Sequence, residues 1–143
     1  MRGWAREQIR VQRIFTENYL QTCGDLKNQK RLAPYIALNS DLAIEVMGPN
    51  GEVLVALEYE ASGQSTVRYE EKLRSYYHAE EVPAVLYVCD RRATIDRLVI
   101  CNNAIAQETE QESKLYFCQK DFIQFGLREL RFNSNSGQVF VIR

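Results

Sequence analysis

Residues 40–60 read SDLAIEVMGPNGEVLVALEYE, and this stretch decides the fold of the chain. Two segments in which apolar residues alternate with others flank an Asn-Gly pair, a strong short-range signal of a β-hairpin. A short polar link over residues 61–65 and a helical run over residues 66–77 follow it. We therefore expect two antiparallel strands that lead directly into a helix, which has an apolar stripe for the core at helical spacing: Tyr69, Leu73, Tyr76 and Tyr77.

Two hairpin registers fit this stretch. If the turn centres on residues 50 and 51, Asp41 pairs with Glu60; if residues 48–51 form the loop, Asp41 pairs with Glu58. Side chains alternate between the two faces of a strand, so both registers place all three carboxylates on one face. The opposite face is apolar throughout and is expected to lie in the core: Leu42, Ile44, Val46, Val53, Val55, Leu57 and Tyr59.

The acidic face of the hairpin also carries Glu45, and it has no Lys or Arg in either register. Like charges opposed on neighbouring strands are destabilising. A raised carboxylate pKa or a bound cation relieves this repulsion, and Mg²⁺ is typically held by one or two carboxylates together with waters and substrate phosphate. The alternative interpretation is that the acidic face is simply the solvated side of a two-faced hairpin.

An Asp at the start of one strand, a turn, a Glu-x-Glu element at the end of the next strand and then a helix resemble the PD-(D/E)XK nuclease superfamily. Within residues 32–117, the segments 40–44, 57–60 and 68–77 look like the replication-relaxation proteins of plasmids and mobile elements. The resemblance implies an α/β fold with a mixed central sheet flanked by helices. It also implies a Mg²⁺- or Mn²⁺-dependent DNA endonuclease that hydrolyses phosphodiester bonds in plasmid or mobile-element DNA.

The same resemblance implies roles for individual residues. Asp41, Glu58 and the carbonyl of Tyr59 would hold the metal ion. Glu60 stands where the superfamily usually has Lys, and it would act as a second metal ligand or as a base. Lys72 on the following helix is the candidate for a displaced Lys, and Asp41, Glu58, Glu60 and Lys72 together form the implied catalytic set.

Further residues complete the implied site. Ser40 stands where the superfamily usually has Pro. An auxiliary acid on the first helix would be Glu17 or Glu7. The residues expected to contact DNA are Arg6, Arg10, Arg13, Gln64 and Arg68.

Two other functions fit the residues. The missing Lys and the near-neutral charge favour a nuclease fold without catalysis that serves as a DNA-binding or protein-interaction module in plasmid replication or mobilisation. A homodimer or a partner protein would then supply contacts to DNA. The third interpretation is a scaffold subunit that binds no nucleic acid and uses the Tyr-rich helix as an interface.

The composition is that of one globular domain spanning residues 1–143, with a formal net charge of −1. No apolar run approaches the ~20 residues that cross a bilayer, so we expect no membrane contact and a cytoplasmic location. Four widely spaced cysteines and a single His argue against a zinc site and against His-based hydrolysis. Seven basic residues against three acidic ones within residues 1–31 suggest an anionic partner.

The rest of the chain gives a coarse prediction of its elements. Residues 4–22 are expected to form an amphipathic helix with an arginine stripe, and residues 34–38 a short strand. Around the predicted core of residues 32–118, the remaining expectations are a buried strand at 83–89, a helix at 91–107, a strand at 114–118, a helical turn at 121–126 and a hairpin at 128–142.

Overall fold

The computed structural model describes residues 10–22, 26–48, 51–61, 63–120, 130–134 and 139–142. The strands are β1 (Arg10–Thr16), β2 (Leu42–Gly48), β3 (Gly51–Glu60), β4 (Val85–Cys89), β5 (Leu115–Gln119), β6 (Leu130–Asn133) and β7 (Val139–Ile142). The helices are α1 (Glu17–Thr22), α2 (Leu26–Ala37), α3 (Thr66–His78) and α4 (Arg92–Thr109).

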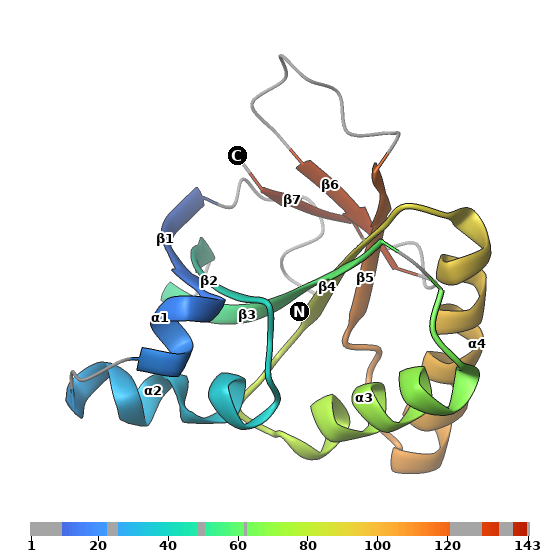
Figure 1. The fold of residues 1–143 in the computed structure, drawn as a ribbon, viewed down its shortest axis with the longest axis horizontal. Helices are drawn as coiled ribbons and strands as arrows, with labels where there is room; N and C mark the ends of the chain where they lie inside the picture. The colour runs from blue at the N-terminus through green and yellow to red at the C-terminus, as the bar shows by residue number, and fades with distance from the viewer. Residues whose placement is uncertain are drawn as a thin grey trace.

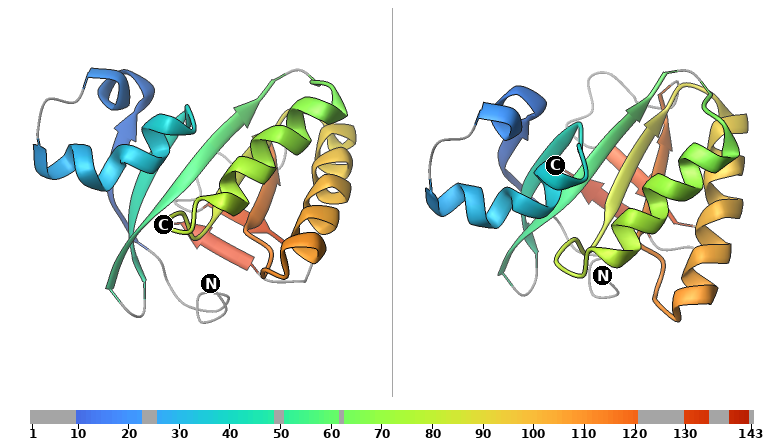
Figure 2. Two further views of the ribbon diagram at one scale, coloured as in Figure 1. Left: turned by 90° about the horizontal axis from the view of Figure 1, so that it is seen from below. Right: turned by 60° about the horizontal axis from the view of Figure 1, so that its bottom comes forward.

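All of these strands form one mixed sheet in chain order, from β1 to β7 (Figure 1). β3, β4 and β5 are parallel, and the other neighbouring pairs are antiparallel. The two parallel connections pass through α3 and α4, which lie side by side against the sheet in both views of Figure 2. The predicted α/β class with a mixed central sheet is confirmed.

The register of the hairpin is now fixed. Leu42 pairs with Leu57 and Gly48 pairs with Gly51, which places Asp41 opposite Glu58 just beyond the end of the ladder. This is the second of the two predicted registers. Gly51 has φ of 116°, a backbone conformation that residues with a Cβ rarely adopt, so the turn depends on this glycine.

Both faces of the hairpin are buried over most of their length, but Tyr59 is 43% exposed, so its predicted place in the core is wrong. The predicted apolar face supplies Ile44, Val46 and Val55 to one cluster, together with residues of β4, β5 and Phe132 of β6. The acidic face packs beneath the helices, because its Ala43, Leu54 and Ala56 belong to the larger cluster, which includes residues from each of α1, α2, α3 and α4. The interpretation of the acidic face as a solvated surface is therefore wrong over most of its length.

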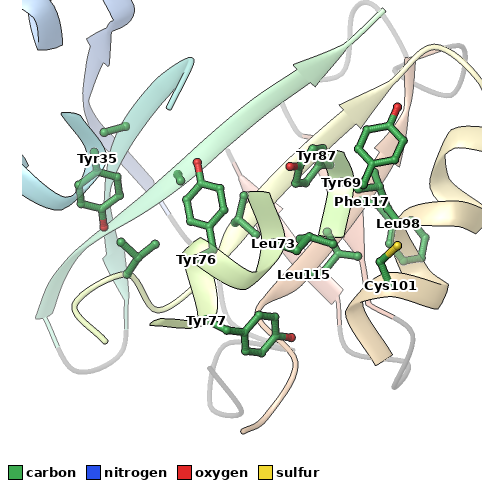
Figure 3. Close-up of a cluster of buried hydrophobic side chains, with 14 of the residues drawn as sticks. Tyr35, Tyr69, Leu73, Tyr76, Tyr77, Tyr87, Leu98, Cys101, Leu115 and Phe117 are labelled. Carbon is green, nitrogen blue, oxygen red and sulfur yellow. The ribbon is translucent and has the colours of Figure 1, made fainter. Parts of the chain in front are cut away.

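Tyrosine side chains fill much of the larger cluster. Tyr35 from α2, Tyr76 from α3 and Tyr87 from β4 project into the layer between the helices and the sheet (Figure 3). The predicted core stripe on α3 is confirmed, since Tyr69, Leu73, Tyr76 and Tyr77 are all buried. A buried tyrosine brings a hydroxyl that needs a hydrogen-bond partner, and these hydroxyls shape the site described below.

The prediction of a helix over residues 4–22 is wrong for residues 10–16, which form β1, and residues 4–9 lie outside the described part of the chain. Val11, Ile14 and Phe15 fit a helical spacing, but β1 satisfies its backbone groups by antiparallel pairing with β2, with a register shift between Val11 and Arg13. Tertiary pairing overrides local periodicity here. Only the short α1 follows the predicted helical conformation.

The strand predicted for residues 34–38 is also wrong, because residues 34–37 belong to α2 with Pro34 inside the helix. Leu32 and Tyr35 are both buried at a spacing of three residues, which suits a helix packed on the sheet. Pro34 removes one backbone donor, but its carbonyl still accepts from Leu38 at 3.0 Å. Burial of one helix face outweighs the usual preference of Pro for extended segments.

The predictions for the rest of the chain are confirmed where the structure describes it. α3, β4, α4 and β5 lie where the sequence placed them, and β6 pairs with β7 as an antiparallel hairpin. The helical turn predicted at 121–126 lies outside the described residues. None of the helices described here combines the length and the apolar composition needed to cross a bilayer.

Candidate functional site

A polar pocket of about 530 Å³ opens where the end of β3, the end of α2 and one side of α3 meet. Seven residues that the sequence singled out line it: Asp41, Glu58, Tyr59, Glu60, Gln64, Arg68 and Lys72. The other lining residues are Ala37, Leu38, Asn39, Tyr69, Glu71, Ser75 and Tyr87. The hairpin register and the crossover through α3 together create this meeting point.

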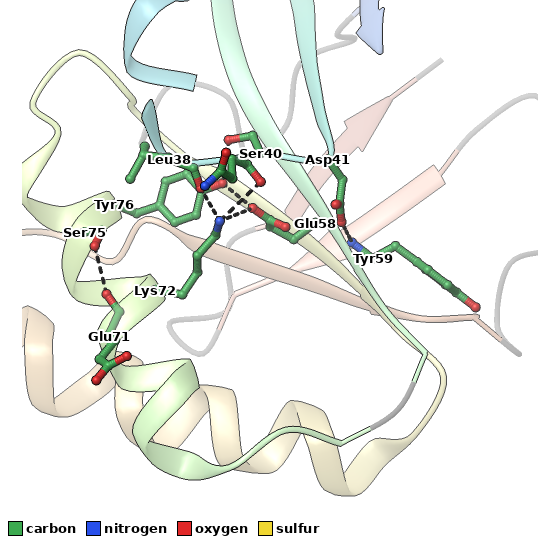
Figure 4. Close-up of polar contacts among 10 residues, drawn as sticks. Leu38, Ser40, Asp41, Glu58, Tyr59, Glu71, Lys72, Ser75 and Tyr76 are labelled. Carbon is green, nitrogen blue, oxygen red and sulfur yellow. Dashed lines mark hydrogen bonds and ion pairs between the residues drawn. The ribbon is translucent and has the colours of Figure 1, made fainter. Parts of the chain in front are cut away.

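Asp41 stands just before β2 and is anchored to the neighbouring strand. Its Oδ2 accepts a hydrogen bond from the Tyr59 backbone N–H at 2.8 Å (Figure 4). The N–H and C=O of one strand residue point to the same side, so the Tyr59 carbonyl also faces the side on which Asp41 lies. The Tyr59 side chain lies on the other face of the sheet, where its hydroxyl donates to Asp90 Oδ1 at 2.7 Å.

Glu58 is the most deeply buried carboxylate in the pocket wall, with 7% of its surface exposed. Its Oε1 accepts a hydrogen bond from the Tyr76 hydroxyl at 2.5 Å and lies 3.5 Å from Lys72 Nζ. Burial raises the pKa of Glu58 to about 7 against the opposing effects of Lys72 and Tyr76, and the nearby Asp41 adds to the rise. Glu58 therefore changes charge near neutral pH.

Lys72 reaches from α3 to the end of α2. Its ammonium group donates to the carbonyl of Leu38 and, at 3.3 Å, to the carbonyl of Asn39 (Figure 4). Asn39 has φ of 52°, the left-handed conformation that commonly ends a helix. A cation at this point suits the negative end of the helix dipole, so Lys72 joins the end of α2 to Glu58.

Glu60, the residue in the place of the usual Lys, lies further along the same pocket. Partial burial raises its pKa, while hydrogen bonds from Gln64 and Tyr69 and the charge of Arg68 oppose the rise. Tyr69 in turn accepts from the Gln64 backbone N–H at 2.8 Å. Glu60, Gln64 and Arg68 thus form one end of the pocket, and Lys72 lies toward the other.

The carboxylates of the pocket suit one class of metal ion and not another. Within the described part of the chain no three His, Cys, Asp or Glu side chains converge, so a closed site of the zinc type has no ligands there. Mg²⁺ is different, because it is commonly held by one or two carboxylates and keeps several waters. The bonds above use Oδ2 of Asp41 and Oε1 of Glu58, and the two carboxyl groups also share a hydrogen bond, which a hard cation between them would replace. Two adjacent carboxylates are of the ligand type that suits Mg²⁺ or Mn²⁺.

Other predicted site residues lie away from the pocket or outside the description. Glu17 begins α1 and lines a separate cavity of about 50 Å³, which shares Asn39 with the main pocket. Arg13 is exposed on β1 and lies over the Phe15 ring at 4.6 Å. Arg10 is in β1 but its side chain is not described, and Arg6 lies outside the described residues.

Sequence reasoning missed two polar features of this region. The Tyr76 hydroxyl contacts both Glu58 and Ser40, although Tyr76 was predicted only as a core residue. Glu45, which is 4% exposed, is hydrogen-bonded and ion-paired to Arg31 of α2. A signal existed for Tyr76, since Tyr rather than Phe at a buried position implies a polar partner. The pairing of Glu45 with Arg31 depends on α2, which the sequence did not predict.

Comparisons of the chain with protein-family models, with curated proteins and with solved structures find no match. The residues and the geometry of the site are therefore the basis on which a function is proposed.

Proposed function

We propose that this protein is a metal-dependent DNA endonuclease of the PD-(D/E)XK type. The observation that supports this most strongly is the meeting of Asp41, Glu58 and Lys72 in the wall of one open polar pocket. Two carboxylates from neighbouring strands and a lysine from the next helix are the groups that metal-assisted phosphodiester hydrolysis needs.

Asp41 and Glu58 would hold Mg²⁺ or Mn²⁺, with the Tyr59 carbonyl as a further ligand. When bound, the ion supplies a Lewis acid for the phosphate and lowers the pKa of a ligated water. Asp41 contributes a carboxylate that the Tyr59 N–H holds in place. Glu58 contributes a carboxylate that is available as a ligand once it is ionised, above a pKa of about 7.

The remaining pocket residues contribute charge and proton transfer. Lys72 places a cation 3.5 Å from Glu58, where it would stabilise negative charge that develops on the phosphate. Glu60, whose pKa is raised by burial, would accept a proton from the attacking water. Arg68 on the same wall would contact a neighbouring phosphate of the DNA backbone.

The test is cleavage of supercoiled plasmid, linear duplex and branched DNA with Mg²⁺ or Mn²⁺ at pH 8. The wild-type protein should nick or cut at least one substrate, and Asp41→Asn and Glu58→Gln should reduce the rate at least 100-fold. Asp90→Asn is the matched control, because Asp90 bonds Tyr59 on the other face of the sheet. Equal metal-dependent cleavage by a pure Asp41→Asn/Glu58→Gln double variant would exclude the proposal.

A second function is favoured by one observation. The Lys72 ammonium is already engaged by the carbonyls of Leu38 and Asn39, and Glu60 occupies the place of the usual Lys. These features suit a nuclease fold that binds DNA or a partner protein without cleaving. In that case DNA would be bound equally well with and without divalent ions, and no variant of Asp41 would change the affinity.

A further inference from the structure

A chain of buried hydrogen bonds links the two halves of the candidate metal site. Ser40 Oγ lies 2.7 Å from the Tyr76 hydroxyl oxygen, and that hydroxyl lies 2.5 Å from Glu58 Oε1. Ser40 immediately precedes Asp41, and Glu58 lies opposite Asp41. Ser40 and Tyr76 are 1% and 0% exposed, so water does not compete for these bonds.

The direction of the chain follows from its proton count. An ionised carboxylate only accepts hydrogen bonds, so the single Tyr76 proton is donated to Glu58. Ser40 must then donate its proton to the Tyr76 oxygen. A hydrogen bond to a charged acceptor in a dry interior is among the stronger kinds.

The backbone on both sides of this chain is also fixed. The Ser40 N–H donates to the Tyr35 carbonyl at 3.1 Å, next to Asn39 in its left-handed conformation. The Tyr76 carbonyl accepts from Lys114 Nζ at 2.9 Å, and Lys114 is 8% exposed. Tyr76 is thus held at its backbone by Lys114 and at its hydroxyl by Ser40 and Glu58.

We propose that Tyr76 is a positioning residue for the candidate metal site, which orients the Glu58 carboxylate and, through Ser40, sets its place relative to Asp41. This inference rests on the proposed function and adds a residue to it. The same chain explains why Ser suits position 40: its hydroxyl bonds Tyr76 and thereby restrains the backbone just before Asp41. Residues that orient a metal ligand from behind typically change metal affinity 10–100-fold when they are removed.

Tyr77 provides a matched control on the same helix. Its hydroxyl is also buried and bonded, donating to Asn102 Oδ1 at 2.5 Å and accepting from the Lys114 N–H at 3.0 Å, and neither partner lies in the pocket. Tyr76→Phe and Tyr77→Phe therefore each remove one buried hydroxyl from α3. Only the first removes a contact to Glu58.

The experiment is calorimetric titration of Mn²⁺ into the wild-type protein and its variants at pH 8, with thermal unfolding of the metal-free proteins in parallel. We expect Tyr76→Phe to weaken Mn²⁺ binding at least tenfold and Tyr77→Phe to leave it within twofold of wild type, while both lower the unfolding midpoint. Ser40→Ala should weaken binding in the same direction, and Ser40→Ala combined with Tyr76→Phe should lose less than the sum of the two single effects. The proposal would be overturned if Tyr76→Phe and Ser40→Ala bound Mn²⁺ with the same affinity as Tyr77→Phe.

The unfolding data keep this result separate from that of the proposed function. Failure of the wild type to bind Mn²⁺ would overturn the metal site, and with it the positioning role. In metal-free protein, Ser40→Ala and Tyr76→Phe should still have non-additive effects on the unfolding midpoint, as members of one hydrogen-bonded chain do. Metal binding by the wild type with strictly additive stability effects would overturn the chain while leaving the proposed function in place. If Tyr76→Phe does not fold, the Mn²⁺ affinity of Ser40→Ala decides the question.

Discussion

Lys72 Nζ lies 3.5 Å from Glu58 Oε1, although the lysine belongs to α3 and the carboxylate to β3. The lysine is also the donor to the carbonyls that end α2, so one ammonium group holds three elements together at the pocket. Lys72 therefore contributes both to the stability of the fold and to the charge of the site.

Replacement of Lys72 should therefore affect both. Lys72→Met removes a cation that lowers the pKa of Glu58, so this pKa should rise above about 7. Loss of the charged donor should also cost about 1–3 kcal/mol of unfolding free energy. Carboxyl NMR titration and urea unfolding measure the two effects. The control is Lys120→Met, which removes a lysine that lies 3.9 Å from Asp90. An unchanged Glu58 pKa in Lys72→Met would contradict the contact between Lys72 and Glu58.

The pH dependence of stability should carry the signature of Glu58. Its pKa is raised from 4.5 in the unfolded chain to about 7 in the folded protein, so the folded state binds the proton more tightly. Stability should then fall as pH rises from about 4.5 to 7 and level off above 7. At about 1.4 kcal/mol for each tenfold change in proton affinity, the total loss of unfolding free energy is at most about 3.5 kcal/mol.

Glu58→Gln is the variant that isolates this effect. The glutamine is neutral throughout, so the decline between pH 4.5 and 7 should be reduced in the variant by the share that Glu58 contributes. Urea unfolding at half-unit steps of pH measures both proteins. Glu52→Gln, at an exposed position near the hairpin turn, should retain the wild-type slope. An identical slope in Glu58→Gln and wild type would show that Glu58 has an ordinary pKa.

The pair formed by Arg31 and Glu45 should be structural. Arg31→Ala leaves the buried Glu45 carboxylate without its cation, and because Arg31 is 35% exposed we expect a loss of roughly 2 kcal/mol rather than the about 3–5 kcal/mol of a fully buried pair. The double variant Arg31→Ala/Glu45→Gln should recover part of this loss. Thermal or urea unfolding of the single and double variants measures these losses. Strictly additive losses of unfolding free energy would indicate that the two side chains do not interact.

Local patterns predicted much of this site, because its key relationships are local. Alternation along two strands was enough to place Asp41, Glu58 and Glu60 on one face in either register. Helical spacing brought Arg68 and Lys72 to one side of α3, and Gln64, which precedes the helix, lines the same pocket. The core stripe of α3 followed from the same periodicity.

The features that the sequence did not predict depend on contacts between distant segments. β1 is a strand because β2 offers it a partner, and α2 is a helix despite Pro34 because Leu32 and Tyr35 pack on the sheet. The burial of Glu45 follows from its pairing with Arg31 across those elements. None of these partners can be identified from the spacing of residues within one segment.

The metal site is tested most directly by a calorimetric titration of Mn²⁺ at pH 8, with and without a DNA oligonucleotide, on wild type, Asp41→Asn and the control Asp90→Asn. Wild type and Asp90→Asn should bind the ion with similar affinity, and Asp41→Asn should bind it at least tenfold more weakly. Mn²⁺ binding by Asp41→Asn at the wild-type affinity, or no binding by wild type with DNA present, would contradict the assignment of Asp41 and Glu58 as a metal site.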